Sequence, residues 1–425
     1  MSPEVGGVKS ATGHVRMLIV AMQMSTDPAE SPARRALDPV EVPLHPGVVT
    51  RMRTAIEAAL DDGPALLPLP THSSVRAALL DEFRPAEPLE SDAAFVVPTS
   101  GSTGRPKGVL LSASAVRAAA NATHERLGGP GRWLLTVPAT HIAGLMVLVR
   151  SVVARTEPVA VDLTHGFDPD LFAAASVRLF ASGTRHYTAV VPRQLATLLD
   201  HGGAAVDALT GYDAVLVGGG AAGDELLARA RAAGAAVVST YGMTETCGGC
   251  VYDGVALPGT QIEISDGRVR LAGPMLATGY RLRPDLSDAF ADGWFTTADL
   301  GHIDEIGRLV VTGRVDDVAV SGGVNVPLAG VDAIVVAHPD VREALSIAVP
   351  DDEWGHRVVT AVVAADPTHP PALDSVRDHV RGQAPAAYAP KELVVVDALP
   401  ALPGGKPDRR GLAAQLGYGP VVTTR

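Results

Sequence analysis

From about residue 45 to residue 240, stretches with helical periodicity alternate with short apolar runs. The helical stretches span residues 48–60, 74–83, 114–127, 193–199 and 224–233, and the apolar runs span residues 65–69, 133–137, 187–191, 214–217 and 236–240. Such alternation is typical of β-α-β units, in which strands are buried on both faces and lack a polar side. We therefore predict an α/β fold built on doubly wound, largely parallel sheets.

After residue 252 the pattern changes. Short alternating runs at 261–264, 268–271 and 309–311 lie between Gly and Asp turns and predict an antiparallel or barrel-like subdomain. From residue 317 onward, helices at 328–337 and 373–383 and strands at 344–349, 358–363 and 393–396 predict a separate α+β domain. We expect a large N-terminal domain at 41–315 that includes the barrel-like subdomain, and a small mobile C-terminal domain at 316–425. Residues 1–40 mix Gly, Ser, Pro and charge, and we expect them to form a disordered extension.

Composition narrows the classes of function. The net charge of −12 argues against nucleic acid and anionic membranes as partners, because both select a basic face. The apolar stretch 133–154 is interrupted by Pro138, His141 and Arg150, so no membrane span is predicted, and no signal peptide is evident. Two cysteines suit a reducing cytoplasm. We expect a cytoplasmic protein with small-molecule partners; the oligomeric state stays open, with a homodimer among the options.

A loop of glycines and hydroxyl side chains at residues 99–108 lies between two apolar runs. Glycines let the backbone turn its N–H groups inward, hydroxyls add donors, and Lys107 adds a positive charge, which together suit a polyphosphate. Only four of the 35 basic residues are lysines, so a lysine here is unusual for this chain. The spacing differs from that of P-loop nucleotidases, and an ordinary surface loop is the alternative. We also expect the helix at 114–127 to follow this loop and to favour anions at its N-terminus.

Further polar segments follow predicted strands. Residues 241–246 come after the strand at 236–240, where Tyr241 offers a stacking face, Thr244 a hydroxyl and Glu245 a hard oxygen ligand for Mg²⁺; a polar turn is the alternative. Asp299 follows an aromatic turn at 293–298, and Arg314 precedes two aspartates at the expected domain junction. A second scarce lysine, Lys406, lies in the loop at 403–407.

Five segments of the chain, taken in order, resemble the motifs of the acyl-adenylate-forming superfamily of acyl-CoA synthetases, luciferases and adenylation domains. They are residues 99–108, 241–246, 293–301, 313–317 and the loop at 403–407. The resemblance covers nearly all of the chain from residue 45 onward. Within the superfamily, residues 241–254 (YGMTETCGGCVYDG), residues 137–145 (VPATHIAGL) and the compact length resemble o-succinylbenzoate–CoA ligases of menaquinone biosynthesis in their actinobacterial form.

The resemblance implies ATP, Mg²⁺ and coenzyme A as ligands, with no redox cofactor, and assigns roles by position. It implies that the β- and γ-phosphates contact Thr99, Ser100, Gly101, Ser102, Thr103, Gly104 and Lys107. The adenine would lie against Gly218, Gly219, Gly220 and Tyr241, and the ribose would contact Asp299 and Arg314. Thr244 would contact the α-phosphate, and Glu245 would bind Mg²⁺. Lys406 stabilises charge at the α-phosphate with Lys107 as its auxiliary, Asp316 is the hinge, and Gly322 and Gly323 line the channel for coenzyme A.

The chemistry agrees with these roles. A carboxylate is already ionised at pH 7, so its attack on the α-phosphorus needs positioning and charge neutralisation rather than a base. A thiol then displaces AMP from the acyl-adenylate. Because o-succinylbenzoate carries a second carboxylate, its buried charge must be paired, and we expect Arg150 to pair it while His141 and Gly242 close the acyl pocket. A core histidine and a surface arginine are the alternatives for His141 and Arg150.

Three alternatives stay open. The chain could activate another aryl or acyl acid, or load a carrier protein as a stand-alone adenylation enzyme, because acid choice depends on pocket shape. A catalytically inactive adenylate-binding protein is disfavoured, because Lys107, Glu245, Asp299, Arg314 and Lys406 are all present. Cys247 and Cys250 form a C-x-x-C pair, but no second pair completes a zinc site, and we expect these residues to line the acyl pocket.

Overall fold

The computed structural model describes residues 35–99, 106–181, 183–401 and 407–419. Its first sheet has the strand order β1-β2-β3-β4-β14, with β1 to β3 parallel and the later pairs antiparallel. These strands are β1 (Leu37–Val42), β2 (Ala65–Pro70), β3 (Phe95–Thr99), β4 (Lys107–Leu111) and β14 (Gly279–Tyr280). Because β1 begins at Leu37, residues 37–40 belong to this sheet. The disordered extension predicted for residues 1–40 is therefore wrong at its C-terminal end.

The second sheet has the order β11-β10-β9-β8-β7-β5-β6 and is parallel from β9 to β6. Its strands are β5 (Gly131–Leu135), β6 (Val159–Ala160), β7 (Arg185–Val190), β8 (Ala214–Val217), β9 (Val237–Met243), β10 (Gly248–Tyr252) and β11 (Val255–Ala256). Strand β8 shows why the runs are wholly apolar: Ala214 and Leu216 face one core cluster, and Val215 and Val217 face another. The doubly wound architecture predicted from the sequence is therefore confirmed.

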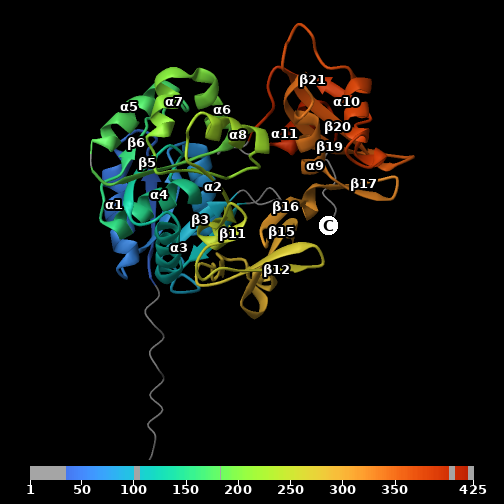
Figure 1. Cartoon of the computed structure of the whole chain (residues 1–425). Coiled ribbons are helices and arrows are strands. Elements are labelled where there is room, and N and C mark those ends of the chain that lie inside the picture. Colours follow the sequence, from blue (N-terminus) through green and yellow to red (C-terminus); the bar gives the residue numbers. More distant parts are fainter. Residues whose placement is uncertain (1–34, 100–105, 182, 402–406, 420–425) are drawn as a thin grey trace, which may run out of the picture. The chain divides into compact units, whose positions relative to one another are not determined.

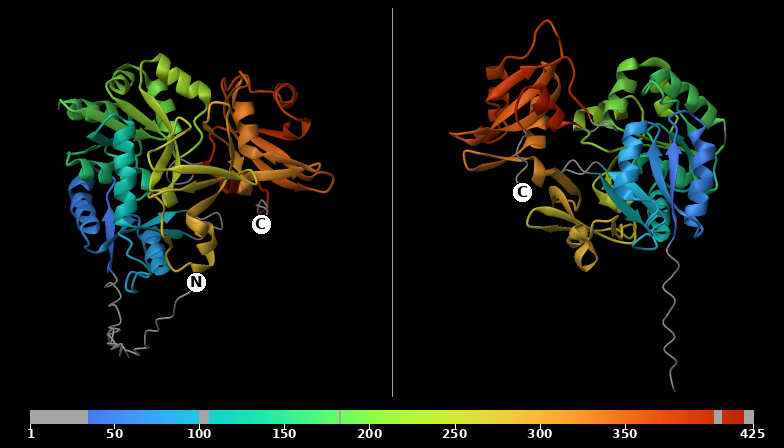
Figure 2. Two further views of the ribbon diagram at one scale, coloured as in Figure 1. Left: turned by 60° about the horizontal axis from the view of Figure 1, so that its bottom comes forward. Right: turned by 180° about the vertical axis from the view of Figure 1, so that it is seen from behind.

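Helices cover both faces of these sheets (Figures 1 and 2). The core between the two sheets contains side chains of α1 (Val48–Leu60), α3 (Ala113–Arg126) and α4 (Ile142–Ala154). Side chains of α2 (Ser73–Phe83) pack on the other face of the first sheet. The other face of the second sheet is covered by α5 (Pro169–Phe180), α6 (Pro192–His201), α7 (Gly203–Thr210) and α8 (Asp224–Ala232). None of the helices in the described residues is long and apolar enough to cross a membrane.

The predicted antiparallel subdomain is a four-stranded sheet of order β12-β13-β15-β16. Its strands are β12 (Gln261–Ser265), β13 (Arg268–Ala272), β15 (Trp294–Ile303) and β16 (Leu309–Arg314), and the 3₁₀ segment η2 (Pro284–Gly293) precedes β15. Asp299 lies within β15 rather than after a turn, because the strand begins directly at Trp294.

The C-terminal part has its own sheet of order β18-β17-β20-β19, with β21 beside β20. Its elements are β17 (Val318–Ser321), β18 (Val324–Pro327), α9 (Leu328–Val336), β19 (Val341–Asp351), β20 (Gly355–Ala364), α10 (Leu373–Arg381), η4 (Ala386–Tyr388), β21 (Glu392–Val395) and α11 (Arg409–Gln415). Helices α9 and α10 pack on one face of this sheet and α11 on the other. The predicted α+β character of this part is confirmed.

Candidate functional site

Asp299 lies between a tyrosine and an arginine from two other strands. The Tyr241 hydroxyl of β9 donates to Asp299 Oδ2 (2.8 Å), and Arg314 Nη1 at the end of β16 donates to Asp299 Oδ1 (2.8 Å). Asp299 is 6% exposed and pairs with Arg314 in the strand register. Burial, together with the Asp299 charge, holds the pKa of Tyr241 well above its usual range, so the tyrosine remains a hydrogen-bond donor. The residue expected at the adenine and the two expected at the ribose thus form one linked group.

The backbone at Gly218 is packed against the strand that carries Tyr241. A Cβ atom at Gly218 would lie 2.2 Å from Thr240 Oγ1, and Gly219 has a φ of +80°. The three glycines 218–220 follow the carboxyl end of β8, beside β9. Position 218 therefore has no room for a side chain beside Thr240, at the edge of the sheet where open α/β sheets bind ligands.

A second linked group contains Glu245 and Lys107, joined by a tyrosine that sequence reasoning missed. The Tyr280 hydroxyl donates to Glu245 Oε1 (2.9 Å), and Lys107 Nζ lies 5.3 Å from the centroid of the Tyr280 ring. Thr244 and Glu245 form the 3₁₀ turn η1 (Thr244–Thr246) directly after β9. Burial and the Glu245 charge raise the pKa of Tyr280. No local pattern marks Tyr280, because the contact spans 35 residues of sequence.

The glycine and hydroxyl loop joins the two strands of a hairpin. Thr99 and Lys107 face each other in the β3–β4 register, and Thr99 Oγ1 donates to the Lys107 carbonyl (3.3 Å). Ser100, Gly101, Ser102, Thr103 and Gly104 lie outside the described residues. Helix α3 starts after β4, where its N-cap Ser112 accepts from the Ala115 N–H (3.1 Å). Helix α3 thus follows the loop after β4, and whether its N-terminus favours an anion stays a prediction.

Arg281, also missed from the sequence, anchors this region. Its fully buried guanidinium donates to the carbonyls of Phe83, Arg84, Glu87 and Pro88 and to Glu90 Oε2. Its backbone N–H donates to the Gly108 carbonyl (2.7 Å). Arg281 therefore fixes the strand that carries Tyr280 to both the hairpin and the segment 83–90.

The residues expected to close the acyl pocket lie around α4. His141 is its N-cap residue, and Arg150, two turns inside the helix, is 3% exposed with its guanidinium carbon 5.0 Å from the Trp133 ring centroid. A Cβ at Gly242 would lie 2.1 Å from the Gly248 carbonyl, so the β9–β10 hairpin is closely packed there. The surface-arginine alternative for Arg150 is therefore wrong.

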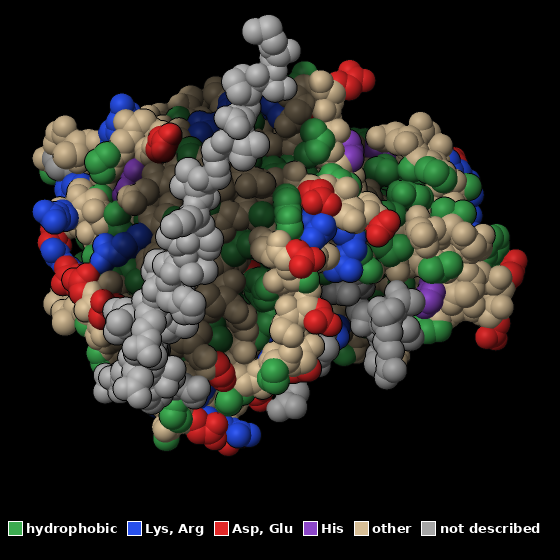
Figure 3. All heavy atoms as spheres, turned by 90° about the horizontal axis from the view of Figure 1, so that it is seen from below, with side chains coloured by type: hydrophobic (Ala, Val, Ile, Leu, Met, Phe, Trp, Pro, Cys, Tyr) green, Lys and Arg blue, Asp and Glu red, His purple; other side chains and the backbone are tan. Residues whose placement is uncertain are grey.

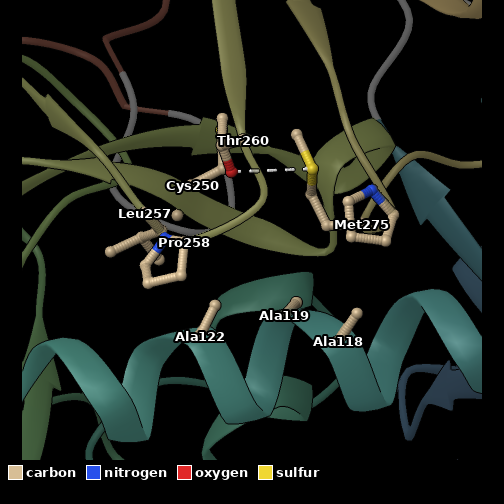
Figure 4. Close-up of a pocket in the computed structure, with 10 residues that line it drawn as sticks. Ala118, Ala119, Ala122, Cys250, Leu257, Pro258, Thr260 and Met275 are labelled. Atoms are coloured by element: carbon tan, nitrogen blue, oxygen red, sulfur yellow. Dashed lines mark hydrogen bonds between the residues drawn. The ribbon is translucent and has the colours of Figure 1, made fainter.

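The two cysteines are free and buried. Burial raises the pKa of Cys247, with the charge of Cys250 as the smaller cause, and burial raises that of Cys250 to about 12, which disfavours the thiolate needed for metal binding or disulfide exchange. Cys250 borders a small apolar hollow with Ala118, Ala119 and Ala122 of α3 (Figure 4). No cluster of three potential metal ligands occurs among the described side chains.

In the C-terminal part, Asp316 lies in the 3₁₀ turn η3 (Val315–Asp317), and Gly322 and Gly323 form the β17–β18 turn with φ of +57° and +78°. Lys406 lies outside the described residues. Beyond it, Arg409 Nη2 donates to Asp332 Oδ2 (2.8 Å), and its Nε lies 3.5 Å from Asp317 Oδ2.

On the face shown in Figure 3, acidic and basic side chains lie in small mixed groups.

Comparisons with known proteins show which family this chain resembles. A model of the AMP-binding enzyme family matches residues 13–281, and a model of the AMP-binding enzyme C-terminal domain matches residues 330–406. A probable 2-succinylbenzoate–CoA ligase of Mycobacterium tuberculosis strain H37Rv is 48% identical over 82% of this chain and 90% of its own length.

Two solved structures are similar in both fold and sequence. The o-succinylbenzoate CoA synthetase of Bacillus subtilis, in complex with the acyl-adenylate intermediate OSB-AMP, has a TM-score of 0.68 and 26% identity and covers 85% of this chain and 80% of that one. The amide bond synthetase McbA of Marinactinospora thermotolerans has a TM-score of 0.70 and 27% identity, with 88% and 84% covered. The chain belongs to the AMP-binding enzyme family.

Proposed function

We propose that this chain is an ATP-dependent 2-succinylbenzoate (o-succinylbenzoate)–CoA ligase acting in menaquinone biosynthesis. The observation that carries the choice of acid is the 48% identity, over most of both chains, to a relative named for that reaction. The reaction uses ATP and coenzyme A, and free buried cysteines suit the reducing cytoplasm where both occur.

The nucleotide lies along the carboxyl edge of the second sheet. Tyr241 presents its ring to the adenine while its hydroxyl holds Asp299, and Asp299 and Arg314 clamp the ribose hydroxyls. Gly218, Gly219 and Gly220 let the purine approach the backbone, because a Cβ at Gly218 has no room. The linked geometry of Tyr241, Asp299 and Arg314 supports this role.

The phosphates and the cation lie beside η1. Glu245 suits Mg²⁺, because a carboxylate offers hard oxygen ligands and keeps lone pairs beyond the one that accepts from Tyr280. Bound Mg²⁺ would neutralise phosphate charge. Thr244 holds the α-phosphate, and Lys107, with the hydroxyls and N–H groups of residues 99–104, holds the β- and γ-phosphates.

The reaction has two steps. A carboxylate oxygen of the acid attacks the α-phosphorus, the bond to the bridging oxygen breaks, and pyrophosphate leaves; Lys406 neutralises charge developing at the α-phosphate. The sulfur of coenzyme A then attacks the acyl carbon, the C–O bond to AMP breaks, and the thiol proton is released. We place coenzyme A beside Gly322 and Gly323, and a hinge at Asp316 that exchanges Lys406 for the thiol channel between steps.

The acid lies between α4 and the β9–β10 hairpin. His141 at the start of α4 and Gly242 on β9 border the reacting carboxylate, and Arg150 pairs the second carboxylate. A buried carboxylate needs such a partner, since an unpaired charge away from water is costly.

The deciding experiment measures pyrophosphate release with a panel of acids, with and without coenzyme A. We expect turnover on 2-succinylbenzoate and formation of its CoA thioester. Strong turnover on benzoates or fatty acids with none on 2-succinylbenzoate would refute the assigned acid. An amine used in place of coenzyme A would instead favour an amide synthetase like the similar structure above.

Lys406→Ala separates an active enzyme from an inactive nucleotide-binding protein. We expect acyl-adenylate formation to be lost while ATP binding, measured by calorimetry, is largely retained. Undiminished adenylation by this variant would contradict the role of Lys406.

A further inference from the structure

The strand that carries Asp299 bulges beside that residue, in the sheet that contains β12, β15 and β16 (Figure 1). In the register of β13 and β15, the single residue Val269 of β13 lies opposite residues 297–299 of β15. On its other side Asp299 stays paired with Arg314 of β16. Bulges occur next to active sites, where they turn a side chain in a new direction. The direction of the Asp299 carboxylate therefore depends on what holds this bulge.

Backbone groups at a bulge lose their partners in the strand ladder, and one hydroxyl replaces two of those partners here. Thr297 Oγ1 donates to the Val269 carbonyl (2.8 Å) and accepts from the Asp299 N–H (3.0 Å). Thr297 is 1% exposed and Val269 is fully buried, so water does not substitute for these bonds. The hydroxyl therefore ties the backbone of Asp299 to β13 across the bulge.

An arginine binds the backbone carbonyl of Thr297 itself. Arg268 Nε and Nη2 both donate to this oxygen, at 3.0 and 2.7 Å, and hydrogen bonds from a charged donor are the stronger kind. Arg268 directly follows the tight turn at Asp266 and Gly267, which have φ of +51° and +75°. The Gly301 N–H, just past the bulge, donates to the Gly267 carbonyl (3.0 Å). The start of β13 thus holds the bulge at both of its ends.

The other arginine of β13 shows a more ordinary arrangement. Arg270 Nη1 donates to Glu263 Oε1 (2.9 Å), and its guanidinium carbon lies 5.3 Å from the centroid of the Trp294 ring. Its partners are therefore side chains of the same sheet. Arg268 instead directs two donors at one backbone oxygen, at the point where the strand leaves its regular path.

We propose that Arg268 and Thr297 are positioning residues, which hold the bulge at residues 297–299 and thereby direct the Asp299 carboxylate at the ribose hydroxyls of the nucleotide. Both act through Asp299 rather than by contact with the nucleotide. This inference rests on the proposed function, in which Asp299 binds the ribose, and it extends control of nucleotide affinity to two side chains behind the clamp.

A nucleotide without ribose hydroxyls makes the test specific to Asp299. Binding of ATP and of 2′,3′-dideoxy-ATP is measured by calorimetry with Mg²⁺ and without any acid. A hydrogen bond to a charged group is worth a factor of about 10 or more, so the wild type should prefer ATP by at least about 10-fold. Thr297→Val keeps the shape and removes the hydroxyl, so this preference should fall to about twofold, through weaker binding of ATP alone. Thr297→Ser keeps the hydroxyl and should restore the preference.

Matched controls separate positioning from a loss of stability. Arg268→Met should reduce the preference for ATP about 5- to 10-fold, because two charge-assisted hydrogen bonds to the bulge are lost. Arg270→Met removes the same type of side chain from the same strand and should leave the preference unchanged. Thr188→Val removes another buried hydroxyl, which donates to the Leu134 carbonyl (3.1 Å), and should lower the thermal midpoint as Thr297→Val does without changing the preference.

The possible outcomes are distinct. Equal losses on both nucleotides, or an unchanged preference in Thr297→Val and Arg268→Met, would mark these residues as purely structural and overturn the proposal. A wild type with no preference for ATP would overturn it together with the ribose role of Asp299. Absence of turnover on 2-succinylbenzoate would reject the proposed ligase, yet a preference lost in Thr297→Val and restored in Thr297→Ser would still support the positioning role.

Discussion

Tyr280 provides the sharpest test of how the site is assembled. Its hydroxyl is the described donor to Glu245, the proposed Mg²⁺ ligand, and its ring lies beneath Lys107. Tyr280→Phe removes the hydrogen bond and keeps the ring. A hydrogen bond to a charged group is worth about 1.5–3 kcal/mol, or a factor of about 10–100, and loss of a residue that orients a metal ligand has a similar cost. We therefore expect kcat/KM for MgATP to fall about 10-fold or more, with KM for the acid nearly unchanged.

The chain contains a matched control. Tyr418 donates to Glu392 Oε1 (2.7 Å) and lies beneath Arg357 at 5.6 Å, so Tyr418→Phe breaks the same kind of contact away from the proposed site. Both variants are compared by pyrophosphate release at fixed free Mg²⁺ and by thermal unfolding. Similar losses of stability with a loss of kcat/KM only in Tyr280→Phe would support the role of Tyr280. If Tyr280→Phe kept kcat/KM within twofold of the wild type, Tyr280 would be structural and the reasoning refuted.

Three further predictions follow from the structure. Tyr241→Phe keeps the stacking face but removes a donor to Asp299, so KM for ATP should rise about 10-fold with adenine binding still detectable by calorimetry; an unchanged KM would contradict the clamp. Folding lowers the pKa of His124 from its usual 6.5 to about 4, so the unfolded chain binds a proton at a higher pH than the folded chain does. The free energy of unfolding should therefore decrease by up to ~3 kcal/mol as the pH falls from about 6.5 to 4. In urea unfolding at a series of pH values, His124→Gln should remove most of this decrease. Arg409→Met leaves the half-buried Asp332 carboxylate with the Ser346 N–H but without its cation, and should cost up to about 3 kcal/mol in urea unfolding; a second change, Asp332→Asn, should recover part of that loss.

The sequence predicts a helix or strand well where the local pattern of apolar residues is enough to determine that structure. The helix at 48–60 is found at the same residues, because Met52, Ile56 and Ala59 repeat at helical spacing and are all buried. The pattern from residue 328 onward likewise predicts α9, β19, β20, α10 and β21. Two missed elements have a weak or atypical pattern: β1 contains Asp, Pro and Glu, and α7 begins with glycine. Their form depends on neighbours that the local sequence does not identify. A third, α5, is missed although its N-cap Asp168 and the proline that follows are local helix signals.

The contacts that build the site follow a different rule. Motifs indicate which residues we propose for the chemistry, as with Tyr241, Glu245 and Asp299, but they do not indicate which side chains hold them. The residues that hold them are distant in sequence: Tyr280 is 35 positions from Glu245, and Arg281 is more than 190 positions from its acceptors at 83–90. The same limit applies to Arg150. The sequence predicts an arginine in the acyl pocket, with a surface arginine as the alternative. Only the structure, in which Arg150 is 3% exposed and its Nε has no hydrogen-bond partner among the described residues, excludes the surface position. Local patterns therefore identify the residues proposed for the chemistry, whereas the burial of each side chain and the partners that hold it follow only from contacts between distant segments.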